Sequence, residues 1–340
     1  MERINFIGAG AAPLQFIQKR CFPLLKYLAN RLAMSLIVLL VVVVILALLI
    51  QIVPGDPAVM ILGPRASPEL INKVRAAMGL DKPVLVQIGN FAWNALHGNF
   101  GTDIFSGRSI NTMIAGALPH TLALSLSGLA LAVILGVPLG IYSAYHTGSW
   151  MDRFIAFFSV SLTTIPTYVT GLLLLIIFAV ELKVMPAMGI GRTGNALDYV
   201  WHLILPAVAL AISWIGYLAR LVRASLLEVM HENYIQAARA GGLSERLIRY
   251  KYALKNALIP IVAVLGNGMG SLMGGAVFLE IIFARPGMGT LILNAIADRN
   301  YPVVQASVLV VTILFVAVNL LADVVYTALD RRIQLGKDRG

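Results

Sequence analysis

The residues that could carry covalent chemistry are few and scattered in this sequence. The five histidines, at positions 97, 120, 146, 202 and 231, show no metal-ligand spacing, and no HExxH or CxxC motif occurs. A phosphate loop of the form GxxxxGKS or GxxxxGKT and a GxSxG nucleophile elbow are also absent. The sequence therefore predicts no catalytic residue, no metal site and no cofactor in this chain.

Two glycine-rich pieces are weak candidates for nucleotide binding. They are "GNGMGSLMGG" at 266–275 and "RPGMG" at 285–289. The first lies in an apolar run long enough to cross a membrane, where small residues commonly permit close packing of helices. We favour that packing role over a nucleotide site.

Two acidic residues fall within or beside apolar runs, and an ionisable group there is a functional hypothesis by default. Asp323 lies in "LLADVVY", and a role in a proton relay is one interpretation. We favour the other, a place near the inner end of the run within reach of water or a basic residue. Glu280 lies near the outer end of another run, where we expect an interfacial position.

The elements that must position these residues are membrane helices. Hydrophobic residues make up 59% of the chain and charged residues 12%, about half the charged share of a soluble domain. Apolar runs of bilayer length without strand alternation predict helices. Six spans are expected, at about 32–53, 121–143, 154–180, 199–219, 257–282 and 303–328.

The first apolar run is a retained helix rather than a secretory signal. Residues 32–53 would reach roughly 33 Å as a helix, enough for a bilayer core of about 30 Å. The core of a signal peptide is shorter and ends at a small-residue cleavage site, whereas this run ends in "PGDP". We therefore expect it to stay in the membrane.

The basic residues predict the orientation. With a cytoplasmic N-terminus, 17 of the 26 Lys and Arg residues fall in the short inside segments. The formal net charge of +10 thus reports topology, and nucleic acid is not needed to explain it. The predicted organisation is a cytoplasmic segment at 1–30, a span at 31–53, an external loop with a short helix at 54–120, a core of five spans at 121–328 with a cytoplasmic loop at 224–256, and a cytoplasmic tail at 329–340. Both termini are expected inside.

Polar stretches within two spans are candidates for a solute pathway. The segment "SLTTIPTYVTG" at 161–171 contains a proline that should free a backbone carbonyl. The segment "GNGMGS" at 266–271 is the other. Such stretches either line a cavity or pack helices, and we leave both open. The candidate pathway residues are Thr164, Pro166, Thr167, Asn267 and Ser271.

The loop "YIQAARAGGLSERLIRYKYALKNALIP" at 234–260 is the largest polar interruption of the apolar core. Arg220 and Arg223 before it suit the C-terminus of the fourth span. Alanines favour a helix up to 240, and Gly241 and Gly242 should end it because glycine tolerates the left-handed conformation of a C-cap. Ser244 can cap a second helix, whose predicted apolar stripe consists of Leu247, Tyr250, Leu254 and Ala257.

This loop has two interpretations on its pattern alone. The small residues at the corner suit close approach by a cytosolic partner. Alternatively, the basic helix that follows would rest on anionic lipid, as basic amphipathic helices often do. Pattern alone favours the lipid interpretation slightly.

A family resemblance favours the partner interpretation for the corner at 236–244 and leaves the lipid interpretation open for the basic helix that follows. The loop resembles the EAA loop of membrane subunits of ATP-binding-cassette importers, with "QAARAGG" and then the proline of "ALIP". Further segments resemble the dipeptide, oligopeptide and nickel group of these permeases, over roughly residues 24–335. They are "VPGDPA" (53–58), "GLDKP" (79–83), "LPHTLALS" (118–125), "ARAGGLSE" (238–245), "ALKNALIPIV" (253–262), "GGAVFLEIIFARPGMG" (274–289) and "RNYPVVQA" (299–306).

The resemblance implies an all-α polytopic protein of six transmembrane helices, with the type I importer permease fold and a cytoplasmic coupling helix, in the inner membrane. It implies a homologous second permease subunit, two cytosolic ATPase subunits that bind ATP and Mg, and an external solute-binding protein. The residues that would couple to the ATPase are Gln236, Ala237, Ala238, Arg239, Ala240, Gly241, Gly242, Leu243 and Ser244. Gln236 replaces the Glu of the motif, and Gly241 stands where Lys is common.

We therefore expect a permease subunit of an ATP-driven, binding-protein-dependent importer, which forms half of the pathway and performs no catalysis. Dipeptides or oligopeptides are the expected solute. Nickel or another small solute carried by the same type of importer is one alternative. An ion-coupled secondary transporter is another, although it would need its own ion site and only Asp323 is available.

Overall fold

The computed structural model describes residues 30–48, 57–62, 66–78 and 81–329. Every regular element in these ranges is helical, apart from an isolated bridge between Thr102 and Ser109. After an initial helix, Asn30–Leu48, the elements are α2 (Pro57–Leu62), α3 (Pro68–Met78), α4 (Val84–Leu96), α5 (Ile110–Tyr145), α6 (Trp150–Thr164), α7 (Thr167–Leu174), η1 (Leu175–Glu181), α8 (Ala196–Met230), α9 (Asn233–Ala240), α10 (Glu245–Leu247), η2 (Ile248–Ala253), α11 (Leu254–Ala257), α12 (Ile259–Ile282), α13 (Met288–Ala297) and α14 (Tyr301–Leu329). The two η segments are π-helical.

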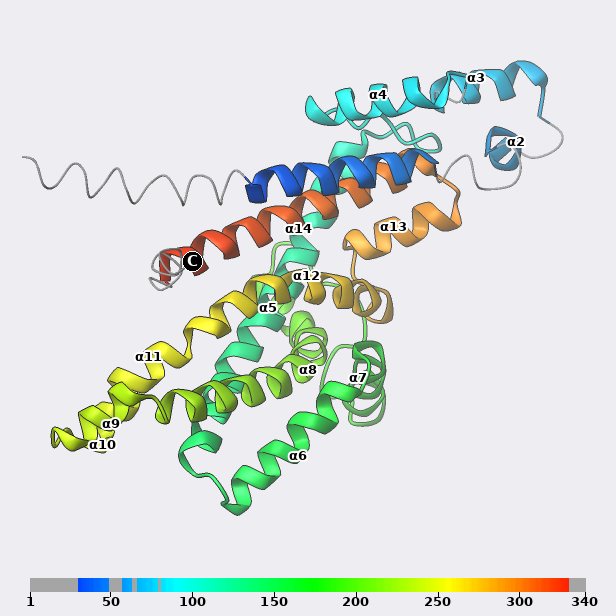
Figure 1. Cartoon of the computed structure of the whole chain (residues 1–340). Coiled ribbons are helices and arrows are strands. Elements are labelled where there is room, and N and C mark those ends of the chain that lie inside the picture. Colours follow the sequence, from blue (N-terminus) through cyan, green and yellow to red (C-terminus); the bar gives the residue numbers. More distant parts are fainter. Residues whose placement is uncertain (1–29, 49–56, 63–65, 79–80, 330–340) are drawn as a thin grey trace, which may run out of the picture.

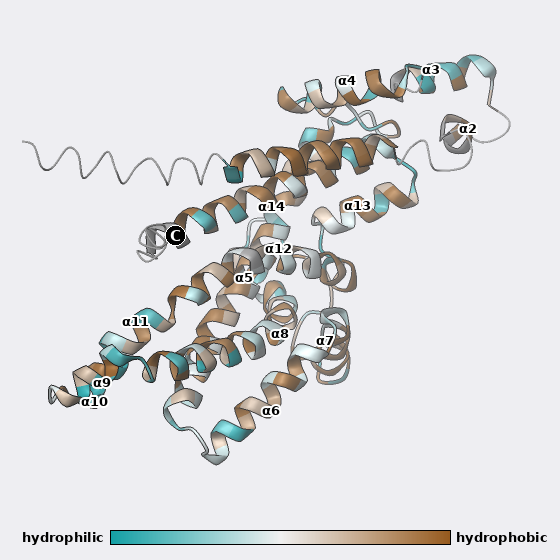
Figure 2. Cartoon of the chain, viewed as in Figure 1, coloured by the Kyte–Doolittle hydropathy of each residue, from teal (hydrophilic) through white to brown (hydrophobic). Residues whose placement is uncertain are grey.

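The expected membrane spans are present. Four single helices of the described chain are long and apolar enough to cross a bilayer: Asn30–Leu48, Ile110–Tyr145, Ala196–Met230 and Tyr301–Val325. Two bent pairs, α6 with α7–η1 and Glu245–Gly266 with Gly268–Ile282, bring the number to six when each pair counts as one span. Hydrophobic residues, coloured brown in Figure 2, occur along all of these helices.

Two of these helices are longer than their apolar runs indicate. α5 begins at Ile110, well before position 121, so the end of the expected external loop is helical. α8 continues to Met230, so Arg220 and Arg223 lie inside the helix and their expected place at its C-terminus is wrong. Hydropathy reports the thickness of the hydrocarbon layer, whereas a helix can continue past it into water.

The third span is broken rather than continuous. α6 ends at Thr164, Ile165 has extended backbone angles, and α7 begins after Pro166 at an angle of 102° to α6. Proline lacks a backbone N–H, its ring clashes with the preceding turn, and the residue before it avoids helical angles. The hydroxyls of Thr163 and Thr164 donate to carbonyls three and four residues earlier in α6, a pattern that often bends helices.

The first helix lies against the last one. In Figure 1 it runs beside α14, and the side-chain amide of Gln305 donates to the carbonyl of Leu46 over 3.0 Å. At the other end of the pair, Arg31 Nε lies 3.3 Å from Asp323 Oδ2. This ion pair confirms the interpretation that Asp323 has a basic partner. The expected N-terminal segment up to residue 29 and the tail from residue 330 lie outside the described residues.

α5 and α8 form the centre of the helical core. Their backbones approach closely at glycines of α5, because a Cβ on Gly140 would lie 2.6 Å from both Ala219 O and Val222 Cβ. A Cβ on Gly136 would lie 2.9 Å from Ile215 O. These glycines were not predicted as a contact, since spacing alone does not say which partner helix a small residue meets.

The outer segment before α5 contains the expected short helix. α3 begins at Pro68, and Ser67 Oγ accepts a hydrogen bond from Leu70 N over 3.3 Å, which confirms Ser67 as its cap. Two further helices, α2 and α4, lie in this segment and were not predicted. In Figure 1, α3 and α4 lie at the end of the molecule opposite α9 and α10.

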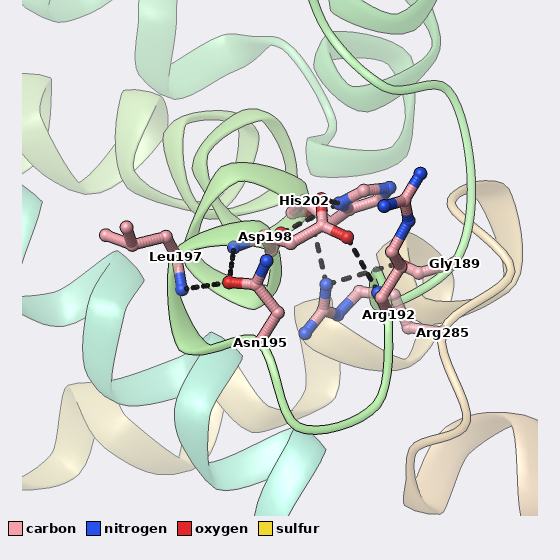
Figure 3. A network of polar contacts seen from close by, with 7 residues as sticks. All are labelled: Gly189, Arg192, Asn195, Leu197, Asp198, His202 and Arg285. Atoms are coloured by element: carbon pink, nitrogen blue, oxygen red, sulfur yellow. Dashed lines mark hydrogen bonds and ion pairs between the residues drawn. The ribbon is translucent and has the colours of Figure 1, made fainter.

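The loop that leads into α8 is tied to the end of α12. Asn195 caps α8 by accepting bonds from the backbone N–H groups of Leu197 and Asp198 (Figure 3). Asp198 accepts a bond of 2.7 Å from Arg192 N and lies 3.2 Å from His202 Nδ1. Arg285 then reaches across from the α12–α13 connection to two carbonyls of this region.

Glu280 and Arg285 are both fully buried, at 0% exposure. Arg285 Nη1 donates to the carbonyls of His202 (3.2 Å) and Gly189 (3.4 Å), and burial lowers the pKa of Arg285. Glu280 accepts from the Thr121 hydroxyl and, over 2.7 Å, from Gly289 N. The α12–α13 corner (residues 280–289) thus folds back over the Glu280 carboxyl group and encloses it, which the expectation of an interfacial position did not include.

Candidate functional site

The α9–α10 corner (residues 236–245) has the conformation that its glycines predict. α9 ends at Ala240, and Gly242 adopts φ +76°, the left-handed region. Leu243 N donates to Ala238 O over 3.2 Å, and Gly242 N donates to Arg239 O over 3.0 Å. This pair of bonds is a Schellman motif, which satisfies the last carbonyls of the helix.

The corner projects away from the rest of the chain. Eight of the nine residues expected to couple to an ATPase are exposed, and Ala238 is half-buried against the core. A Cβ on Gly242 would meet no atom within 4 Å. Figure 1 places α9 and α10 at one extremity of the molecule. The structure thus brings the nine residues together on a surface with free space around it.

The second helix begins where it was expected but in a different form. Ser244 occupies the N-cap position of α10, yet its hydroxyl makes no capping hydrogen bond, so that part of the prediction is wrong. After three residues the chain becomes π-helical through η2. A π turn bonds i to i+5 and contains more residues than an α turn, so the following side chains rotate off the α-helical stripe.

The predicted apolar stripe is therefore wrong in its register. Leu247 and Tyr250 are exposed, at 37% and 58%, whereas Ile248 and Ala253 are fully buried. Ala257 is buried as predicted, and the half-buried Leu254 packs against the same cluster. The exposed apolar and basic side chains of this segment line an open surface hollow, whose residues are Ser244, Arg246, Leu247, Arg249, Tyr250 and Lys251.

Ion pairs at the corner join its two helices. Glu245 Oε1 lies 2.7 Å from Arg239 Nε, and Glu245 Oε2 lies 3.7 Å from Arg249 Nε. All three side chains are between 39% and 51% exposed, so water screens their charges. Gln236, which stands where the motif has Glu, donates to His231 O over 3.2 Å.

The corner is attached to the core through buried side chains and Tyr145. Ile235 of α9 and Ile248 of η2 are fully buried in one cluster with residues of α5 and α8. Tyr145, the last residue of α5, donates its hydroxyl to Arg249 O over 2.8 Å, and the Arg249 guanidinium lies 5.1 Å from its ring centroid. A displacement of the corner would therefore act directly on α5 and α8.

An ion pair between the buried Asp152 and the half-buried Arg223 joins α6 to α8 near the same end. Arg223 Nε lies 2.8 Å from Asp152 Oδ1, and Arg223 Nη2 lies 3.0 Å from Asp152 Oδ2. Asp152 also accepts from the Ser143 hydroxyl and from Gly148 N. This pair was not predicted, because the two residues are 71 positions apart and no local pattern relates them.

The candidate pathway residues come together only in part. A cavity of about 450 Å³, open to the surface, lies between α6, α8 and α12 and is lined by Thr163, Ser213, Trp214, Tyr217, Val264, Gly268 and Ser271. Ser271 was predicted, and Thr163 is the neighbour of the predicted Thr164. Thr164 and Pro166 are exposed and Thr167 is half-buried, and none of these three lines the cavity. The side chain of Asn267 lies outside the described residues.

The contribution of α8 to this cavity was not predicted. Ser213, Trp214 and Tyr217 lie in a run that hydropathy marks only as a span, and a single serine in it gave no signal. In the described part of the chain, no three His, Cys, Asp or Glu residues come together as metal ligands could. The geometry offers a hollow between helices and an exposed corner.

Comparison with protein families assigns the chain. Residues 136–335 match the binding-protein-dependent transport system inner membrane component, and residues 24–125 match the N-terminal part of the same kind of membrane component. The chain belongs to this permease family. It is thus a multi-pass inner-membrane permease subunit of an ATP-binding-cassette importer and does not itself catalyse a reaction. Because the chain belongs to this importer family, it is not the ion-coupled secondary transporter considered as an alternative.

Individual relatives support the same assignment over almost the whole permease. A probable peptide transporter permease of Sinorhizobium fredii is 36% identical over 309 residues, 91% of this chain and 99% of the relative. A putative peptide transport permease of Brucella abortus is 38% identical, covering 90% of this chain and 98% of the relative. The glutathione transport permease of Escherichia coli K12 is 36% identical, covering 92% and 99%.

A solved structure supports the fold. The permease resembles a chain of the inward-facing methionine transporter MetNI with a TM-score of 0.54, at 19% identity, covering 64% of this chain and 97% of that chain. The importer permease fold expected from the sequence is therefore confirmed.

Proposed function

We propose that the chain forms one half of the translocation pathway of a peptide importer and receives the motion of cytosolic ATPase subunits at the α9–α10 corner. The observation that carries this proposal is the corner itself, a left-handed glycine turn with open space around Gly242. Its small residues permit close approach by another surface. Its buried isoleucines and Tyr145 connect it to α5 and α8.

The mechanism follows from differential binding. ATP would be bound, with Mg, by the partner subunits, and their closure would push residues 236–244. The permease can respond only if the partner binds its two conformations with different affinity. Motion of the corner would then be transmitted through η2 to α5, α8 and α12, the last two of which line the cavity.

Peptides are the proposed solute, because relatives that match over nine-tenths of this chain are named as peptide or glutathione permeases. Nickel or another small solute is the second candidate. The remaining partners would be a homologous permease subunit, an external solute-binding protein and membrane lipid. The segments with most Lys and Arg would face the cytoplasm together with both termini.

The test is Gly242→Asp in the assembled complex. We expect normal amounts of the permease in the membrane, but loss of ATPase copurification and of solute uptake, because a charged side chain occupies the contact surface. Gly98→Asp is the matched control, since Gly98 is also a left-handed glycine at which an added Cβ would meet no atom within 4 Å, and it lies in the segment proposed to be external. Copurification and uptake that both survive Gly242→Asp would contradict the docking proposal.

Ala238→Glu is a second variant at the same corner. Ala238 is half-buried against the core cluster, so this change also strains local packing. We expect it to abolish uptake, with a loss of stability that comes from packing, whereas Gly242→Asp and its control Gly98→Asp cost only the strain of a left-handed aspartate. A melting temperature measured for both variants separates the loss of docking from the loss of folding.

A further inference from the structure

Among the residues that the structure describes, none that lines the cavity between α6, α8 and α12 is charged. Its seven lining residues comprise three hydroxyl-bearing Ser or Thr side chains, Trp214, Tyr217, a valine and a glycine. Groups of this kind can form hydrogen bonds with a peptide backbone, but they provide no counter-ion for a charged side chain. A solute in this cavity would therefore be distinguished by size rather than by charge.

The indole of Trp214 is seated directly on the backbone of α12 at Gly268. A Cβ on Gly268 would lie 2.2 Å from Trp214 Cη2 and 2.5 Å from Cζ3, distances that no side chain could occupy. Trp214 also packs edge-on against Tyr217, with ring centroids 5.5 Å apart. The Trp214 ring can therefore occupy this position only because residue 268 is a glycine.

The backbone of α12 cannot easily move away from Trp214. On either side of Gly268, Gly266 and Gly270 pack against α14, where a Cβ would lie 1.8 Å from Ala322 Cβ and 1.9 Å from Phe315 Cε2 respectively. The helix also bends by 45° between the segments that end at Gly266 and begin at Gly268. α14 therefore holds α12 from behind, and Trp214 packs on the other side of the helix at the cavity.

We propose that Trp214, seated on Gly268, is a specificity-determining residue that limits the size of the peptide side chain that enters the cavity. This inference rests on the proposed function, because it assumes that the cavity lies on the solute pathway. Removal of the indole would widen the space beside α12. A methyl group at position 268 would instead displace the ring and narrow or deform that space.

The experiment compares uptake of two peptides by the complete complex with its ATPase and binding protein. The probes are alanyl-alanine and alanyl-tryptophan, and the measured quantity is the ratio of their uptake rates. Because the same binding protein serves every variant, a change in this ratio reports the permease. For Trp214→Ala we expect the ratio to shift towards alanyl-tryptophan by about tenfold, the lower range of discrimination by small changes in an apolar pocket.

Gly268→Ala should shift the ratio in the opposite direction. Gly274→Ala is its matched control, because it makes the same change in the same helix at a position where a Cβ meets no atom within 4 Å. Trp214→Phe retains an aromatic ring and provides a second variant if Trp214→Ala does not assemble. The uptake ratio of alanyl-aspartate to alanyl-lysine should stay at its wild-type value in all four variants.

An unchanged alanyl-tryptophan ratio in Trp214→Ala or Trp214→Phe, with both peptides taken up, would overturn the inference but leave the proposed function standing. A wild-type complex that takes up none of the four peptides would overturn the proposed solute and the inference with it. Equal losses of both probes in Gly268→Ala and Gly274→Ala would assign Gly268 to helix packing alone and would also contradict the inference.

Discussion

The α9–α10 corner and the α12–α13 corner both combine glycines with charged residues, but their packing is opposite. At the α12–α13 corner, Glu280 and Arg285 are 0% exposed, and a Cβ on Gly287 would lie 2.1 Å from the Glu280 carboxyl group. At the α9–α10 corner, Glu245 is 51% exposed, and a Cβ added to Gly242 would have no neighbour within 4 Å.

The difference in packing shows that glycine is required for a different reason at each corner. At the α12–α13 corner the space is already filled by the chain itself, so the glycines and the buried polar groups belong to the folded core. At the α9–α10 corner the backbone needs a left-handed residue, but the space around it is open to another molecule. Substitutions should therefore damage folding at the first corner and partner contact at the second.

The largest effect on stability is expected from Glu280→Ala. The Thr121 hydroxyl and Gly289 N would lose their acceptor inside the core, and each buried donor left unsatisfied costs about 1–3 kcal/mol. We expect a strong fall in the melting temperature of the detergent-purified protein. Glu280→Gln keeps one acceptor oxygen, so its melting temperature should fall less. If Glu280→Ala unfolded at the wild-type melting temperature, the claim that the α12–α13 corner belongs to the folded core would be contradicted.

The same small substitution should give different results at the two corners. In Gly289→Ala, the new Cβ would lie 2.6 Å from Val277 Cα, and overpacking of this kind costs about 1–3 kcal/mol. In Gly241→Ala, φ is −76° and the nearest atom to the new Cβ is Ala237 O at 3.4 Å, so alanine fits. Thermal unfolding of the two variants should show destabilisation in Gly289→Ala alone. Equal shifts would contradict the comparison.

A pH-dependent effect of intermediate size on stability is expected at Asp103. This residue lies in the outer segment and accepts a hydrogen bond from Asn300, which follows the α12–α13 corner in the chain. Burial raises the pKa of Asp103, but hydrogen bonds from Ser106, Phe105 and Asn300 outweigh it, so the pKa lies below its usual 3.8. A lowered pKa contributes stability at neutral pH that is lost as the pH falls through it. Asp103→Asn should lower the melting temperature at pH 7, and the difference from wild type should shrink in acid. A difference that is constant with pH would contradict this account.

The smallest effect on stability is expected from Glu245→Gln. The change removes the ion pairs with Arg239 and Arg249, but these charges are exposed and screened by water. We expect a melting temperature close to that of the wild type, with any residual difference reduced further by added salt. Destabilisation as large as that of Glu280→Ala would show that the α9–α10 corner is part of the core.

Much of the fold could be predicted because local chemistry determines it. Hydropathy located the four spanning helices and the two bent pairs of the described chain, since a helix must satisfy its own backbone in hydrocarbon and needs a fixed apolar length. The Schellman turn at Gly242 and the cap at Ser67 were also predictable, because both depend on a few adjacent residues. Local signals failed at the π-helical segment η2, where bonds from i to i+5 shift the buried face to Ile248.

The candidate sites were predicted unequally for the same reason. Residues 236–244 are contiguous, so their motif brings them to one corner whatever the rest of the chain does. The cavity depends on three helices, and of its lining Ser271 could be predicted, whereas Ser213, Trp214 and Tyr217 of α8 could not. No periodicity within α8 could show that Trp214 meets Gly268, because that contact is made between distant segments.

The sequence by itself determined the membrane class, the apolar runs of the spans and the place of the glycine corner at 241–242, and a set of its segments resembles one permease family. Each of these follows from composition, apolar length or a short motif. Only the tertiary structure decided that Glu280 is enclosed by the chain itself, that Asp152 pairs with Arg223, and that α5 meets α8 at its glycines. The physical reason is that burial and long-range pairing depend on which helices pack together, and a glycine or a carboxylate has the same letter whether its neighbour is water or another helix.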